Sequence, residues 1–252
     1  MSRDKFVMGN WKMNGTKETV HALLHEISTL HLSSPHAHAV VFPPYVYLEK
    51  VAWECRHAMI KWGAQDVSPY ENGAYTGEVS APMLKDMGCE YVLIGHSERR
   101  EYFGETNEMI AQKFLQAAKA GLRPVLCVGE TLEDHRTHNT QQKVLAQLES
   151  VLKYPIALKY LPQLIVAYEP IWAIGTGLTA TPDEAQRVHA FIREIAAECS
   201  KEFADHLSIL YGGSVKASNA KALFAMPDID GGLVGGASLV GEEFKSICHA
   251  ME

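Results

Sequence analysis

The stretch LIVAYEPIWAIGTG, residues 164–177, joins a buried strand to a loop and decides how the rest of the chain is interpreted. Residues 164–167 are a run of apolar strand formers, so Glu169 is expected where the strand ends. Pro170 moves Glu169 away from helical backbone and stiffens the chain. An apolar tip, residues 171–173, precedes a glycine-rich hinge, residues 175–177. The pattern predicts a carboxylate at the base of a movable apolar flap. An ordinary strand-to-helix connection would give a similar pattern.

The same change from apolar run to helical pattern recurs along the whole chain. Residues 181–184, TPDE, form a helix start with an N-cap, a proline in the first turn and a capping-box glutamate. Most of the apolar runs are continuous, as strands covered on both faces require. Eight such strands are predicted, at residues 6–10, 39–42, 61–67, 91–96, 124–129, 164–169, 207–211 and 232–235.

Eight βα units without a linker or composition shift predict one α/β domain, a (β/α)8 barrel over residues 1–252. An open doubly wound sheet is the alternative fold. No G-x-G-x-x-G opens a helix after any strand, which disfavours it. Residues 68–80 are a long loop rich in Gly, Asn and Tyr, and such a loop on a compact barrel is usually functional or intersubunit.

Composition and charge argue against several classes of function and location. The net charge of −7 and the lack of a basic stripe argue against a nucleic-acid partner, whereas a local site can still bind a small anion. No apolar run reaches about 18 residues and the N-terminus has no signal-like segment, so neither a membrane span nor secretion is expected. Five scattered cysteines without a C-x-x-C pair suit a reducing cytoplasm.

The twelve histidines do not form a metal-binding motif. His21 and His25 share a predicted helix face, and His135 with His138 is similarly spaced. Neither pair has carboxylates or thiols in a ligand pattern, so we interpret all four as solvated surface residues.

Polar residues at the predicted strand ends are the candidates for chemistry, because the active site of a parallel barrel lies at that face. Strand one is followed by Asn10 and Lys12, strand four ends at His96 and strand six ends at Glu169. Strands seven and eight end in Gly-Gly turns, followed by Ser214 and Ser238 respectively. Each feature alone has an ordinary structural explanation. Together they place a cation, an imidazole, a carboxylate and two phosphate-binding turns at one barrel mouth.

The motifs that contain these residues resemble triosephosphate isomerase over essentially the whole chain. They are GNWKMNG at 9–15, ENGAYTGEVS at 71–80, IGHSERR at 94–100, CVGE at 127–130, AYEPIWAIGTG at 167–177, YGGSV at 211–215 and LVGGASL at 233–239. Leu178 and Ile171 depart from the family's common lysine and valine, which concerns the flap's motion and not its chemistry.

The resemblance implies a cofactor-free interconversion of dihydroxyacetone phosphate and glyceraldehyde 3-phosphate. Glu169 would move the proton between carbons and His96 would polarise the carbonyl as a neutral ring, a known feature of this family. Lys12 would supply positive charge, with Asn10 hydrogen-bonding nearby. The phosphate would be held by Gly175, Ser214, Gly235 and Gly236.

The resemblance also implies a homodimer, in which the loop around Tyr75, Thr76 and Gly77 braces the partner's segment near Lys12. Two other functions compete with an isomerase. A Schiff-base aldolase would need a lysine at an inner strand end, whereas Lys12 lies beyond the end of strand one. A scaffold protein that has lost the reaction would have little reason to keep Lys12, His96 and Glu169 together.

Overall fold

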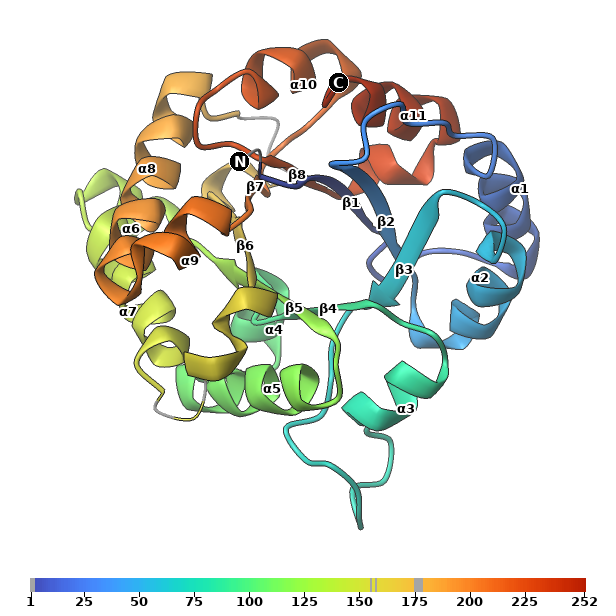
Figure 1. Ribbon diagram of the computed structural model, residues 1–252, viewed down its shortest axis with the longest axis horizontal. Helices are drawn as coiled ribbons and strands as arrows, with labels where there is room; N and C mark the ends of the chain where they lie inside the picture. The colour runs from blue at the N-terminus through green and yellow to red at the C-terminus, as the bar shows by residue number, and fades with distance from the viewer. Residues whose placement is uncertain (1–2, 155, 157, 175–178) are drawn as a thin grey trace.

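The computed structural model describes residues 3–154, 156, 158–174 and 179–252. Its centre is a closed barrel of eight parallel strands in chain order, surrounded by helices (Figure 1). The strands are β1 Lys5–Asn10, β2 Ala37–Phe42, β3 Ile60–Ala64, β4 Tyr91–Ile94, β5 Arg123–Val128, β6 Ile165–Tyr168, β7 Ile209–Tyr211 and β8 Gly231–Val234. The barrel is closed by β8 pairing with β1, where Phe6 is opposite Gly231, so the predicted barrel is confirmed and the open sheet is wrong.

The helices lie between successive strands and cover the outside of the barrel. They are α1 Lys17–Ile27, α2 Leu48–Cys55, α3 Ala81–Asp86, α4 Ser97–Tyr102, α5 Asn107–Lys119, α6 Leu132–Arg136, α7 Thr140–Leu152, α8 Pro182–Cys199, α9 Lys201–His206, α10 Ala217–Phe224 and α11 Gly241–His249. Short 3-10 helices are η1 Tyr45–Tyr47, η2 Leu158–Gln163, η3 Ile171–Ala173 and η4 Gly236–Leu239. The sequence pattern indicated one main helix per unit and did not resolve α6 and α9 as separate short helices.

Two apolar layers explain why the strands are apolar on both faces. Alternate residues such as Phe6, Met8 and Phe42 fill the inside of the barrel. Their neighbours, including Val7 and Val41, face outward and pack beneath the helices. Since successive side chains of a strand point to opposite sides, both must be apolar when both sides are buried.

Five strands, β3, β4, β5, β6 and β8, end one to three residues earlier than the sequence pattern predicts, and three of these ends concern the site. β4 ends at Ile94 because Gly95 has φ +67° and turns the chain, which leaves His96 as the N-cap of α4. β6 ends at Tyr168, although the Glu169 amide still donates to Val128 O at 2.7 Å. β3 ends at Ala64 instead of residue 67, since it pairs with β4 only at Gly63 and Ala64. At each of these three strand ends, a polar side chain lies outside the hydrogen-bonded strand, at the mouth of the barrel.

The predicted start of α8 is confirmed. Thr181 accepts a hydrogen bond from the Glu184 amide, the Glu184 carboxylate accepts one from Thr181 N–H, and Pro182 occupies the first turn. This capping box fixes the chain directly after the flap.

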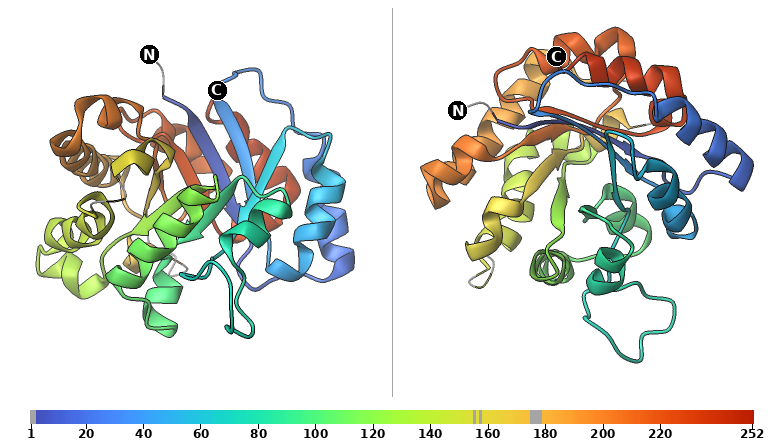
Figure 2. Two further views of the ribbon diagram at one scale, coloured as in Figure 1. Left: turned by 60° about the horizontal axis from the view of Figure 1, so that its bottom comes forward. Right: turned by 45° about the vertical axis from the view of Figure 1, so that its right-hand side comes forward.

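The loop between β3 and α3 projects away from the barrel (Figures 1 and 2). Within it the rings of Tyr70 and Tyr75 stack with centroids 3.9 Å apart. The loop is therefore shaped by its own side chains while its tip remains outside the main body.

Candidate active site

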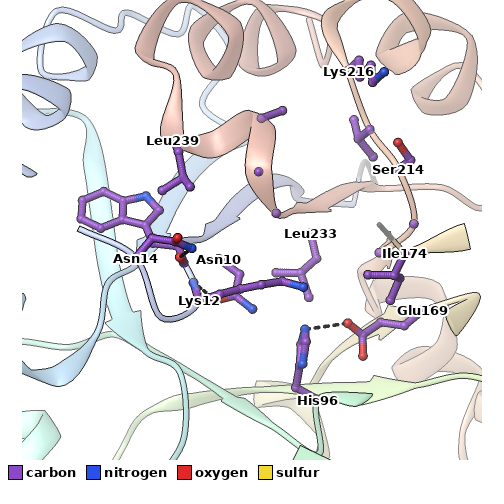
Figure 3. A pocket seen from close by; sticks show the side chains of 17 residues that line it. Asn10, Lys12, Asn14, His96, Glu169, Ile174, Ser214, Lys216, Leu233 and Leu239 are labelled. Carbon is purple, nitrogen blue, oxygen red and sulfur yellow. Dashed lines mark hydrogen bonds and ion pairs between the residues drawn. The ribbon is translucent and has the colours of Figure 1, made fainter. Parts of the chain in front are cut away.

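The carboxylate of Glu169 and the imidazole of His96 meet at the mouth of the barrel (Figure 3). His96 Nε2 lies 2.9 Å from Glu169 Oε1, and the Ser97 amide donates to Glu169 Oε2 at 3.0 Å. On the other side of the ring, the Glu98 amide donates to His96 Nδ1 at 3.3 Å. A ring that accepts at Nδ1 and donates from Nε2 is a neutral imidazole, so this hydrogen-bond pattern favours the neutral form.

The pKa values of the pair are set by burial and by mutual attraction. Burial raises the pKa of Glu169, but the charge and hydrogen bond of His96 and the Ser97 amide bring it below the ordinary carboxyl range. Burial lowers the pKa of His96, while Glu169 and then Glu98 raise it, and the net direction is upward. Attraction to Glu169 therefore favours the protonated form of His96, whereas the hydrogen bond from the Glu98 amide favours the neutral form. Glu169 itself is held ionised and ready to accept a proton.

Lys12 reaches the same site from an unusual backbone conformation. Its φ is +53°, in the left-handed region that a side chain with a Cβ rarely adopts. Two hydrogen bonds hold it there: the Lys12 amide donates to Asn10 Oδ1 at 3.0 Å, and Gln65 Nε2 donates to Lys12 O at 2.8 Å. Such strain persists only where the surroundings fix it, and it is common at functional sites.

Ser214, Gly235 and Gly236 line a cavity of about 340 Å³ together with Asn10, Lys12, His96 and Glu169. A Cβ added to Gly236 would meet nothing within 4 Å, so its backbone is open to a ligand. Leu233, Ile174 and Leu239 give the cavity apolar walls. Gly175, also predicted to bind phosphate, and Leu178 lie outside the described residues. The other predicted site residues are brought together around one small, partly apolar cavity.

Comparison with known proteins identifies the family to which the chain belongs. The family model described as triosephosphate isomerase matches residues 5–251. The chain belongs to the triosephosphate isomerase family. It is 50% identical over 252 residues to the triosephosphate isomerase of Nitrosomonas europaea, covering 100% of both chains. It is 52% identical over 248 residues to that of Xanthomonas campestris pv. campestris, covering 98% of each. The enzyme from Coxiella burnetii is 49% identical over 247 residues, with 98% of this chain and 97% of the relative covered.

Within the site, four polar residues received no role from the sequence pattern. Glu98 accepts from Lys12 Nζ at 2.6 Å and so holds the amine beside His96. Gln65, besides its bond to Lys12 O, donates to Phe42 O at 2.8 Å. Lys216 and Asn14 line the cavity as well. Glu98 directly follows IGHS and could have been noticed, but Gln65 has no local signal because its partners lie on distant strands.

The front of the flap is attached to a buried carboxylate. Glu130 is 0% exposed, and its Oε1 accepts from Trp172 Nε1 at 2.8 Å and from Tyr168 Oη at 3.0 Å. The Ile171 amide donates to Glu130 O at 3.1 Å. The CVGE motif therefore anchors the flap through Glu130, a link that the sequence pattern alone did not assign.

Two further searches concern only the part of the chain that the structure describes. It contains no group of three or more His, Cys, Asp or Glu side chains placed to hold a metal ion. None of its helices combines the length and apolar character needed to cross a membrane.

Proposed function

We propose that Glu169 is the base with which this chain interconverts dihydroxyacetone phosphate and D-glyceraldehyde 3-phosphate. The observation that carries the proposal is the buried Glu169 carboxylate, 2.9 Å from His96 Nε2 in a cavity that Lys12 also lines. Glu169 removes the proton from the carbon beside the carbonyl and returns it to the neighbouring carbon. The hydroxyl proton must also pass to the former carbonyl oxygen, and His96, which contacts the carbonyl, is the group proposed to carry it.

His96 and Lys12 stabilise the charge that develops on the substrate oxygens. A carbon acid is weak, and the enediolate formed on losing its proton needs donors that are already oriented. His96 donates from Nε2, the atom that its interaction with the Glu98 amide leaves protonated. Lys12 adds a positive charge, which acts more strongly when the flap excludes water from the cavity. Asn10 fixes the backbone of Lys12 through its side-chain oxygen.

Glu169 has to give up an existing partner before it can react. In the substrate-free site one of its oxygens pairs with His96 and the other accepts from the Ser97 amide. We propose that the substrate carbonyl replaces Glu169 as the partner of His96. The freed carboxylate oxygen then lies beside the carbon from which it takes the proton.

The phosphate of the substrate is proposed to lie on the backbone amides of Gly235 and Gly236 and on Ser214. Only glycine allows the backbone to approach an anion so closely. The location matches the end of the barrel, after strands seven and eight, where phosphate is commonly bound. Gly175 is proposed as a further phosphate contact on the strength of the family motif alone.

The flap keeps water from the enediolate, which would otherwise lose its phosphate. Triosephosphate isomerase is itself a standard example of such loop closure. Ile174, which directly follows the tip of the flap, lines the same cavity as Glu169, which supports a covering position for the described part of the flap. The Trp172 hydrogen bond to Glu130 holds this position.

We also propose a homodimer. Met13, next to Lys12, is 96% exposed, and Val46, on the η1 helix whose Tyr47 hydroxyl donates to Gly15 O, is 81% exposed. Large exposed apolar side chains close together are typical of an interaction surface. The projecting loop around Thr76 has the shape to cover the corresponding surface of a second copy (Figure 2). The partner would then brace the strained backbone at Lys12.

In the cell, this reaction belongs to glycolysis and gluconeogenesis, and we propose that the chain performs it in the cytoplasm as a single catalytic domain without a cofactor. A coupled assay of triose phosphate isomerisation tests the activity. Borohydride treatment with substrate tests the aldolase alternative, because only a Schiff base would be trapped as a stable adduct. Absence of isomerisation, or trapping of a lysine adduct, would contradict the proposal.

A further inference from the structure

His135 lies against the flap without taking part in the reaction. It is on α6, and its side chain is 40% exposed. The His135 ring stacks on Trp172 with centroids 4.4 Å apart and planes at 29°. The ring is therefore not simply solvated, as the sequence pattern suggested.

The same imidazole is also close to the acceptor that anchors the flap. His135 Nδ1 lies 3.7 Å from Glu130 Oε1, beyond hydrogen-bond distance. That oxygen is occupied by Trp172 Nε1 at 2.8 Å. The other oxygen, Oε2, is buried without a hydrogen-bond partner among the described residues. Among the described residues, the side chains that donate to the Glu130 carboxylate are therefore Tyr168 and Trp172.

Flap opening disturbs this arrangement. When Trp172 moves away with the flap, Glu130 would keep only the Tyr168 hydroxyl as a side-chain donor. A buried acceptor that loses a hydrogen bond is strongly destabilised. The movement of Trp172 also removes the ring on which His135 is stacked, so the imidazole becomes free to move the short distance to Oε1.

We infer that His135 is a positioning residue for flap opening, which donates from Nδ1 to Glu130 as Trp172 Nε1 leaves. The exchange keeps the buried carboxylate hydrogen-bonded in both flap positions. It thereby accelerates opening and the release of product. The inference rests on the proposed role of the flap, but its test does not require proton transfer.

The test measures the dissociation of 2-phosphoglycolate, whose carboxylate resembles the charge of the enediolate, by stopped-flow displacement. His135→Phe retains the stacked ring and loses the donor, and it should slow dissociation roughly 5- to 100-fold, the range for a buried acceptor left one hydrogen bond short. His135→Gln retains a donor and should release the ligand at nearly the wild-type rate. In turnover, His135→Phe should lower kcat and KM together, whereas a general disturbance of the site would raise KM.

A double-mutant cycle isolates the exchange of donors. In Trp172→Phe the flap no longer supplies a donor to Glu130, so adding His135→Phe should change dissociation less than twofold. Equal effects of His135→Phe in both backgrounds would overturn the inference, as would wild-type dissociation from His135→Phe alone. If the wild-type chain fails to bind 2-phosphoglycolate at all, the proposed substrate site is wrong instead.

Discussion

His96 Nε2 and Glu169 Oε1 lie 2.9 Å apart in the substrate-free site, so the proposed electrophile and the proposed base are each other's partners. The contact keeps Glu169 ionised although its side chain is buried. It also keeps both groups oriented toward the place that the substrate has to occupy. Binding of the substrate then gives His96 a new partner and frees one Glu169 oxygen, while the other keeps the Ser97 amide.

Replacing Glu169 by Gln should lower kcat by about 10²–10⁴-fold or more, because the amide cannot accept the proton and the described residues that line the cavity include no other carboxylate. The coupled isomerase assay measures kcat. Binding of 2-phosphoglycolate and thermal unfolding serve as controls for the integrity of the site. A loss of less than tenfold would remove Glu169 from the role of base.

The pKa of Glu169 should rise when His96 is replaced by Asn. Burial raises this pKa, and His96 is the main influence that lowers it. In the wild type, Glu169 should titrate below the ordinary value of 4.5, so its stabilising effect is present above pH 4.5 and is lost as the pH falls through its folded pKa. A ¹³C NMR titration, assigned with Glu169→Gln, measures both values. The attribution to His96 fails if the two titrations coincide.

Gly212→Ala should displace the base more than it disturbs the binding of phosphate. A Cβ at this position would lie 2.9 Å from Glu169 Cγ and 3.1 Å from Tyr168 O. The carboxylate would be displaced, and a misplacement of about 1 Å can reduce the rate roughly 10²-fold. We expect a lower kcat with almost unchanged inhibition by inorganic phosphate. A matching loss of phosphate binding would show that the substitution disturbs the whole barrel mouth.

His189→Phe should make the protein less sensitive to acid. His189 is fully buried beside Tyr168, and burial lowers its pKa to about 4 from 6.5. Between pH 6.5 and about pH 4, His189 is protonated in the unfolded chain but neutral in the folded chain. The free energy of unfolding therefore falls as the pH drops through this window. The loss amounts to about 3 kcal/mol at most. Urea unfolding at several pH values compares the slopes, and identical slopes would exclude His189 as a source of acid sensitivity.

Thr76→Glu should separate the proposed dimer, since it places a charge at the tip of the projecting loop. If the partner braces the left-handed Lys12 backbone, the separated chain should lose most of its kcat/KM. Size-exclusion chromatography with light scattering reports the oligomeric state, and the coupled assay reports activity. A monomer with full activity would show that Lys12 is held without a partner.

The sequence by itself determined the barrel and most of its mouth. Eight apolar runs, each followed by a helical pattern, have few arrangements other than a parallel barrel, and the motifs place Asn10, Lys12, His96 and Glu169 at the strand ends. These features are local, since periodicity and helix caps depend on residues only a few positions apart.

The tertiary structure decided which side chains pair with one another. The contact between His96 and Glu169 joins residues on β4 and β6 loops, and Gln65 reaches Lys12 from the end of β3. The position of His135 between Glu130 and the flap likewise follows from how α6 packs. Such pairings depend on distances between segments far apart in the chain, which no local pattern encodes.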